Sequence, residues 1–244
     1  ALSSIHFPKK NEETELARQR FALEELLLFQ LRVLRDHRQL QTLRAPVINF
    51  DEKLIAVFVS KLSFQLTNDQ RIAAYEILQD LKRSYPMNRL LNGDVGSGKT
   101  VVALIAAYQT VSAGHQAVFM APTEILAEQH FRTVKLLLDI QKTGGITIGL
   151  LTGSGAKQWP IDETMTEKIS KKLILNKIAK GEIDILIGTH AVISAKKPGG
   201  HLGGPATIFT ERVLGGQNSI KFKNLGLVVI DEQHRFGVEQ RMKL

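Results

Sequence analysis

The sequence contains no cysteine, no long apolar run and no start methionine among its 244 residues. Without cysteine the chain cannot form a disulfide, a thiolate nucleophile or a cysteine-ligated zinc or iron–sulfur site. No apolar run approaches the roughly 18 residues of a membrane span, and the N-terminus lacks the basic-then-apolar order of a signal peptide. We therefore expect a protein of a reducing compartment such as the cytoplasm, with no membrane partner. The missing methionine predicts that the chain is a piece of something longer.

Apolar residues make up 43% and charged residues 23% of the sequence, which is ordinary for a soluble globular protein and argues against global disorder. The formal net charge is +8, and the basic excess lies in residues 1–92 and 154–224. Such an excess suggests a polyanionic partner such as nucleic acid. On charge alone, a solvated lysine-rich surface explains it equally well.

Residues 12–45 have the pattern of one long helix. The segment holds no glycine or proline before Pro46, and its leucines from Leu23 to Leu34 recur at three- and four-residue spacings. The length favours one large domain, or one domain plus an appendage. We predict a helical linker at residues 1–62 that packs on a domain at residues 63–244.

From Arg89 onward, short apolar runs alternate with helical stretches. This alternation predicts an α/β fold of three layers, with a parallel sheet covered by helices on both faces. Glycines follow several of the helices, where helices commonly end. The expected strands are Arg89–Asn92, Ala117–Ala121, Ile146–Leu151, Ile183–Gly188 and Leu225–Ile230. The expected helices are Asn68–Arg83, Lys99–Ser112, Glu124–Leu138 and Met165–Lys180.

Residues 194–224 interrupt this rhythm. The stretch is rich in glycine and lysine and has one short β-like piece, Ala206–Phe209. A segment of this length without periodicity is unusual inside a compact domain. We interpret it as a surface insertion.

The segment Gly93–Thr100 matches the phosphate-loop pattern G-x-x-x-x-G-K-[ST] and lies between an expected strand and an expected helix. Its glycines let consecutive backbone N–H groups approach an anion, and the helix N-terminus adds to their positive potential. Lys99 would charge-pair with the β- and γ-phosphates, and the hydroxyl of Thr100 would reach Mg²⁺. The sequence thus predicts a nucleoside triphosphate site. Its expected contacts are Gly93, Gly96, Ser97, Gly98, Lys99 and Thr100.

The apolar run Leu225–Ile230 ends in two adjacent carboxylates, Asp231 and Glu232. Asp231 at the strand end would help to hold Mg²⁺, and Glu232 would orient and polarise the attacking water. Two acidic residues after a buried strand can also simply begin a loop. Together with the phosphate loop they favour nucleotide hydrolysis, with Lys99, Asp231 and Glu232 as the catalytic residues.

The residues from Asp231 to His234 resemble the DExH box of superfamily two helicases and translocases. Residues 64–70 resemble the Q motif of the same group, which implies that Phe64 stacks on adenine and that Gln70 hydrogen-bonds its edge. The nucleotide implied is therefore ATP. The resemblance also implies that the fold is a RecA-like lobe of a P-loop nucleotide hydrolase.

Three further stretches resemble the motifs that line the nucleic-acid track of that group, and they start at Ala121, Leu151 and Gly188. Each follows an expected strand, so their residues should meet at the carboxyl edge of the sheet and contact phosphates without reading sequence. Thr123 and Thr189 can equally be ordinary helix caps, and His190 a structural histidine. The expected DNA contacts are Pro122, Thr123, Thr152, Gly153, Thr189 and His190.

Within this group the chain resembles the RecG family of bacterial branched-DNA helicases. The resemblance rests on GDVGSGKT from Gly93, APTEILAEQH from Ala121, VIDEQHRFGVEQR from Val229 and the N-terminal helix, and it covers nearly the whole chain. It implies an ATP-dependent motor that remodels branched or double-stranded DNA, by fork reversal or Holliday junction branch migration, in repair and recombination. It also implies a monomer in the bacterial cytoplasm, associated with the nucleoid.

Two alternatives stay open. The transcription-repair coupling factor, a double-stranded DNA translocase, shares the style of phosphate loop and the RFGV tail. A nucleotide-gated DNA-binding module without translocation would carry the same loop. Loss of activity altogether is disfavoured by the intact Lys99, Thr100, Asp231 and Glu232.

The resemblance also implies parts that the 244 residues do not contain. These are a wedge domain before Ala1, a third motif and a second motor lobe after Leu244, which would be partners of this lobe. An arginine finger from a second lobe contributes roughly 10³–10⁵ in rate. We therefore expect the isolated chain to bind Mg-nucleotide weakly and to hydrolyse it negligibly.

Overall fold

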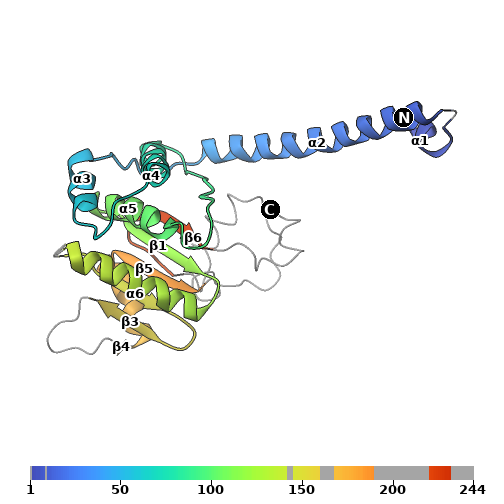
Figure 1. Ribbon diagram of the computed structural model, residues 1–244. Helices are drawn as coiled ribbons and strands as arrows, with labels where there is room; N and C mark the ends of the chain where they lie inside the picture. The colour runs from blue at the N-terminus through green and yellow to red at the C-terminus, as the bar shows by residue number, and fades with distance from the viewer. Residues whose placement is uncertain (1, 9, 142–144, 160–167, 190–219, 232–244) are drawn as a thin grey trace. The chain divides into compact units, whose positions relative to one another are not determined.

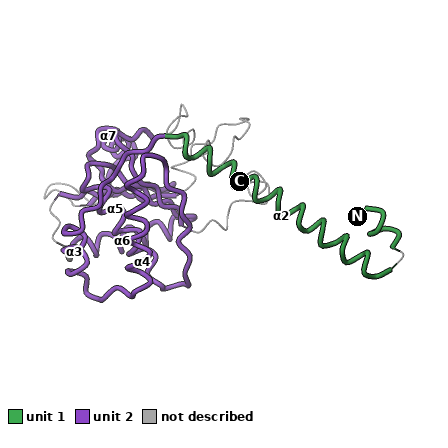
Figure 2. The backbone as a smooth tube through the Cα atoms, turned by 90° about the horizontal axis from the view of Figure 1, so that it is seen from above, with its two compact units in different colours: residues 1–43 green, residues 44–244 purple. Residues whose placement is uncertain are grey.

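The computed structural model describes residues 2–8, 10–141, 145–159, 168–189 and 220–231 (Figure 1). The chain divides into two compact units, residues 1–43 and residues 44–244 (Figure 2). Residues 44–62 thus fall within the second unit, although the domain boundary expected after residue 62 stays a prediction. Among the described residues, no helix combines the length and apolarity that a bilayer crossing requires.

The first unit consists of α1 (Leu2–His6) and the predicted long helix, α2 (Asn11–Thr42). Acidic residues in the first turn of α2, Glu12 and Glu13, complement the helix dipole. The leucines from Leu23 to Leu31 are more than half exposed within this structure. That α2 packs on the domain at residues 63–244 remains a prediction.

The helices that begin the second unit start at side-chain caps. Asp51 accepts a hydrogen bond from the amide of Leu54 at 3.0 Å, and Thr67 and Gln70 form a reciprocal capping box. These caps satisfy amide groups that have no partner inside the helix. The helices capped in this way are α3 (Glu52–Ser60) and α4 (Asn68–Asp80), whereas α5 (Lys99–Ser112) begins after Gly98, which has no side chain to cap it.

The described strands form one six-stranded sheet in the order β4-β3-β2-β5-β1-β6. The four strands β2, β5, β1 and β6 are parallel, which confirms the predicted α/β fold, whereas β3 and β4 are antiparallel and were not predicted. Both missed strands are too short to show a pattern in the sequence. The bounds are β1 (Gln116–Ala121), β2 (Ile148–Leu151), β3 (Ala156–Trp159), β4 (Lys168–Ile169), β5 (Ile185–Thr189) and β6 (Leu225–Ile230).

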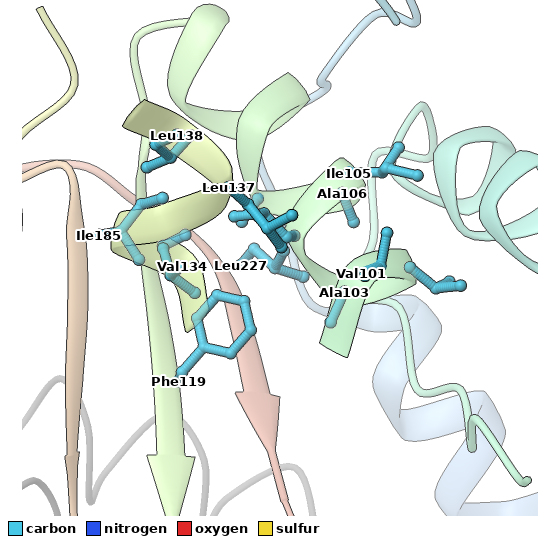
Figure 3. Close-up of a cluster of buried hydrophobic side chains, with 14 of the residues drawn as sticks. Val101, Ala103, Ile105, Ala106, Phe119, Val134, Leu137, Leu138, Ile185 and Leu227 are labelled. Atoms are coloured by element: carbon cyan, nitrogen blue, oxygen red, sulfur yellow. The ribbon is translucent and has the colours of Figure 1, made fainter. Parts of the chain in front are cut away.

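The two faces of the sheet are covered by different helices. Side chains of β1 alternate, so that Phe119 packs with α5 and α6 (Glu124–Gln141), while Val118 and Met120 pack with α7 (Lys171–Lys180). Figure 3 shows Phe119 against Val134 of α6 and beside Leu227 of β6. Apolar residues on both faces of the central strands explain why these strands read as continuous hydrophobic runs.

Two elements differ from the prediction. The strand expected at Arg89–Asn92 is not formed, and the run is not buried in the sheet, since Leu90 is 81% exposed. The helix expected from Met165 begins instead at Lys171, after Ser170, whose hydroxyl accepts from the amide of Leu173 at 3.2 Å. A hydroxyl cap is a stronger start signal than the preceding polar residues.

Chain direction places the start of α5 at the carboxyl edge of the sheet. Only residues 113–115 join α5 to β1, so the helix and the strand run in opposite directions. The 14-residue helix is about 21 Å long and the 6-residue strand about 20 Å. The start of α5 therefore shares an edge of the sheet with the ends of β1, β2, β5 and β6 (Figure 1).

Candidate functional site

The phosphate loop, Gly93–Thr100, is an exposed turn that encloses its own lysine. Gly96 and Gly98 have φ of 82° and 79°, a left-handed conformation that favours glycine. The ammonium of Lys99 donates to the carbonyls of Gly93 at 2.6 Å and Asp94 at 2.7 Å. The positive charge thus lies inside the turn, next to the N-terminus of α5, which is the arrangement that an incoming phosphate requires.

Gln70 joins the predicted adenine motif to this loop. Its side-chain oxygen accepts from the amide of Thr67 at 2.9 Å, and its Nε2 donates to the carbonyl of Ser97 at 2.8 Å. Phe64, the predicted adenine platform, is 43% exposed. The structure therefore brings Gln70 and Ser97 together and leaves Phe64 accessible.

The segment that leads into the loop is tied to α4 by ion pairs. Arg89 contacts Asp80 at 2.6 Å and Glu76 at 2.5 Å, and Arg83 contacts Asp80 at 3.0 Å. The hydrogen bond that Arg89 donates to Asp80, supported by the charges of Asp80 and Glu76, raises the pKa of Arg89 above its ordinary value. Because the carboxylate of Asp80 is almost fully buried, this pairing fixes the residues just before Gly93.

Asp231 lies one residue beyond β6 at the same edge of the sheet. Its amide donates to the carbonyl of Met120 at 2.8 Å, which extends the pairing of β6 with β1. Its carboxylate oxygen Oδ2 lies 2.7 Å from Nε2 of His130 on α6. The Asp231 side chain is 33% exposed and that of His130 14%. The sequence had not singled out His130, although it stands within the quoted stretch APTEILAEQH.

The predicted DNA-contact residues gather at this edge too, with unequal access. Thr123 caps α6 through a hydrogen bond from the amide of Leu126 at 3.3 Å, and Gly153 is exposed. Thr152 and Thr189 are only 3% and 6% exposed. The hydroxyl of Thr152 turns toward Ser154 Oγ at 3.0 Å. For these two threonines, contact with a ligand would fall to backbone groups unless the side chains move.

The β2–β3 turn, residues 152–155, is held by side chains that the sequence did not indicate. Glu124 Oε1 accepts from the amide of Ser154 at 3.1 Å, and the ammonium of Lys171 donates to the carbonyl of Gly153. One turn later on α6, Glu128 pairs with Lys157 of β3 at 2.9 Å. That hydrogen bond is the main cause of the lowered pKa of Glu128.

Two predicted site residues, His190 and Glu232, lie outside the described residues, as do Gln233 and His234. Most of the predicted insertion at residues 194–224 lies there as well. Its last residues are described, and the amide of Lys223 donates to Gln116 Oε1 at 2.8 Å. The predicted roles of His190 and Glu232 stay predictions.

The described residues fit a nucleotide with a magnesium ion. A hydroxyl at Thr100 and a partly exposed carboxylate at Asp231 are the oxygen donors that Mg²⁺ prefers, and magnesium commonly takes one or two protein ligands together with substrate phosphates. The described part of the chain shows no cluster of three or more metal-binding side chains.

Comparison with known proteins gives a family. The model of the DEAD/DEAH box helicase family matches residues 67–244. The whole chain is 40% identical to ATP-dependent DNA helicase RecG of Aquifex aeolicus and 40% identical to that of Bacillus subtilis. The chain spans 27% and 30% of the length of those two relatives.

A solved structure of RecG bound to a three-way DNA junction is similar as well. It matches 96% of this chain with a TM-score of 0.72 and 38% identity, and the match covers 27% of that structure's chain. The similarity confirms the predicted fold of the lobe. It also agrees with the resemblance read from the motifs.

Proposed function

Because the chain belongs to the DEAD/DEAH box helicase family, we propose that it is the ATP-binding lobe of an ATP-dependent DNA helicase. The finer proposal is a RecG-type motor that remodels branched or double-stranded DNA, as in fork reversal and branch migration. Support comes from the 40% identity to two RecG proteins over the whole chain. These relatives favour junction remodelling over displacement of a transcribing polymerase and over a binding module without translocation.

One observation carries the proposal. The phosphate loop at the start of α5 and Asp231 at the end of β6 lie at the same edge of one sheet, where α/β folds bind ligands. A cation for phosphates and a carboxylate for a metal are thus presented from adjacent elements, since α5 packs on both β1 and β6. This pairing is what phosphoryl transfer requires, because its catalysis is mostly positioning and charge neutralisation.

The residues of the loop act by binding and orienting the triphosphate. Lys99 exchanges the carbonyls of Gly93 and Asp94 for phosphate oxygens, which carry full charge and form stronger hydrogen bonds. The backbone amides of the loop then face the same phosphates. Phe64 provides a stacking surface for adenine, and Gln70 can bond its edge if it releases Ser97.

Thr100 and Asp231 would hold Mg²⁺, which when bound neutralises developing charge on the β- and γ-phosphates. Glu232 is proposed to orient the attacking water and accept its proton. Asp231 is held on its other side by His130, so its carboxylate keeps one orientation. An arginine finger from another lobe would complete the site.

For DNA we propose phosphate contacts along the ends of β1, β2 and β5. The contacting groups are those of Pro122, Thr123, Thr152, Gly153, Thr189 and His190. Contacts of this kind position the duplex without reading its sequence. In the longer protein, the wedge domain and the second lobe would be the partners of this lobe, with residues 1–62 as the linker. We place such a monomeric protein in the bacterial cytoplasm, on the nucleoid, in keeping with its bacterial relatives.

The test is the variant Lys99→Ala in the protein at its full natural length. Loss of the ammonium removes a preorganised charge from the phosphates, and we expect ATP hydrolysis in the presence of junction DNA to fall by about 10²–10³-fold. The matched control is Lys53→Ala, which removes an exposed lysine of α3. Hydrolysis that survives Lys99→Ala at the rate of the control would contradict the proposed function.

A further inference from the structure

The contact between His130 and Asp231 joins a helix to the predicted metal carboxylate. The two side chains are 2.7 Å apart at Nε2 and Oδ2, and they are 101 positions apart in the chain. Among the described residues, no other side chain is recorded as bonded to the Asp231 carboxylate. In the described part of the chain, its second oxygen, Oδ1, has no side-chain partner. This is the arrangement in which an imidazole orients a metal-binding carboxylate from behind.

The helix that carries His130 also borders the predicted DNA track. In its first turn, Glu124 accepts from the amide of Ser154 in the β2–β3 turn. Glu124 and His130 are six residues apart on α6, which corresponds to about 9 Å along the axis and about 120° around it. One side of α6 therefore contacts the β2–β3 turn through Glu124, and another side contacts Asp231 through His130.

Between these two contacts, the inner face of α6 is fully buried. The side chains of Ala127, Phe131, Val134 and Leu138 form its inner stripe, and none of them is more than 2% exposed. The stripe lies on the sheet face that β2, β5 and β1 share. Such packing would let α6 move as one rigid element, so that a shift in its first turn would reach His130.

We propose that His130 is a positioning residue that couples DNA occupancy to the nucleotide site. Phosphates that bind at the β2–β3 turn displace or reorient Glu124, α6 shifts on the sheet, and His130 reorients the carboxylate of Asp231. This inference rests on the proposed function and adds the route by which one site affects the other. It requires two arrangements of α6 that DNA and nucleotide favour unequally.

The experiment measures coupling by binding, with the protein at its full natural length. The affinity for a three-way DNA junction is titrated with and without a non-hydrolysable ATP analogue and Mg²⁺, and the ratio of the two dissociation constants is the coupling factor. For the unmodified protein we expect a factor within the usual range of about 5 to 150. In His130→Ala the factor should fall below about 2, while the junction affinity measured without nucleotide stays within about twofold.

Two further variants distinguish the loss of the hydrogen bond from His130 from a general loss of stability of the protein. His130→Gln keeps an N–H donor and should restore most of the coupling factor. Arg132→Ala lies on the same helix, 78% exposed, and should leave the factor unchanged. If His130→Ala does not fold, as melting temperature will report, His130→Met fills the same space without a donor and takes its place.

The outcomes are distinct. The inference would be overturned if the coupling factor were unchanged in His130→Ala, or in His130→Met where the alanine variant does not fold. It would also be overturned if His130→Gln lost as much of the coupling factor as the variant without a donor. Either result would leave the proposed function intact. An unmodified protein that binds both ligands but shows a factor of 1 would overturn it as well. Failure of the unmodified protein to bind nucleotide at all would overturn the proposed function itself, and the inference with it.

Discussion

The phosphate loop and the β2–β3 turn lie at the same edge of the sheet but are held in different ways. In the phosphate loop, Lys99 donates to the carbonyls of Gly93 and Asp94, six and five positions earlier. In the β2–β3 turn, the bonds come from Glu124 and Lys171, which are 30 and 18 positions from the atoms they contact. The first is mostly a local structure, and the second is assembled from separate elements.

This difference explains what each region can tolerate. The phosphate loop depends on the backbone conformation of its glycines. Replacing one of these glycines by a residue that rarely adopts this conformation should therefore disrupt the loop directly. A turn held by several exposed side chains loses only one bond at a time. Substitutions in the phosphate loop should therefore have larger effects than those around the β2–β3 turn.

Among the substitutions that test this comparison, the largest effect should come from Gly98→Ala. A side chain at φ of 79° costs about 1–2 kcal/mol, and the new Cβ would lie 2.5 Å from Nε2 of Gln70, which must leave Ser97. We expect ATP affinity to fall at least about tenfold, measured by titration with a fluorescent ATP analogue. Gly96→Ala is the matched control, since its φ is similar but nothing lies near its Cβ. Equal losses in the two variants would show that Gln70 does not matter.

A smaller effect is expected from Glu124→Ala. The amide of Ser154 loses a charged acceptor at the surface, and we expect the free energy of unfolding to fall by about 0.5–1.5 kcal/mol. Chemical denaturation measures the loss, and hydrogen exchange at the Ser154 amide should become faster. Ile125→Ala, which removes an exposed side chain from the same turn of α6, serves as the control. A protected Ser154 amide in Glu124→Ala would mean that another group holds the turn.

The smallest effect is expected from Glu128→Gln. The hydrogen bond from Lys157 lowers the pKa of Glu128, so the ionised carboxylate stabilises the folded chain above the pKa of the unfolded state. This contribution is lost as pH falls through the folded pKa. Because the side chain is 33% exposed, we expect less than about 1 kcal/mol at pH 7. Urea unfolding of both proteins at pH 7 and in acid measures it, and a difference that persists in acid would exclude the ion pair as its cause.

Most of the fold was predictable because most of its helices and strands have short-range sequence patterns. The strand Leu225–Ile230 and the helix Lys99–Ser112 have the predicted bounds, since buried parallel strands are continuous apolar runs and glycine or a cap marks a helix start. The antiparallel strands β3 and β4 escaped prediction because two to four residues carry no period. The strand expected at Arg89–Asn92 is not formed, since its Leu90 lies exposed instead of entering the core of the sheet.

The candidate site shows the same contrast between features that the local sequence predicts and features that it does not. The sequence pointed to Lys99, Gln70 and Asp231. In the structure, the side chain of Gln70 donates to Ser97 of the phosphate loop, and Asp231 lies at the edge of the sheet where α5 begins. It did not point to His130, Glu124 or Lys171. Each of these makes its contact with a residue 18 to 101 positions away, and no spacing rule predicts such a partner.

The amino-acid sequence by itself determined the glycine-rich phosphate loop, the chain order of the parallel strands β1, β2, β5 and β6, and the acidic residue after β6. Each is fixed by a few neighbouring residues, because backbone conformation and hydrophobic periodicity are short-range properties. Only the tertiary structure decided that α6 contacts both the β2–β3 turn and Asp231. That outcome depends on which strands become neighbours in the sheet, and packing of distant segments, rather than any local pattern, sets it.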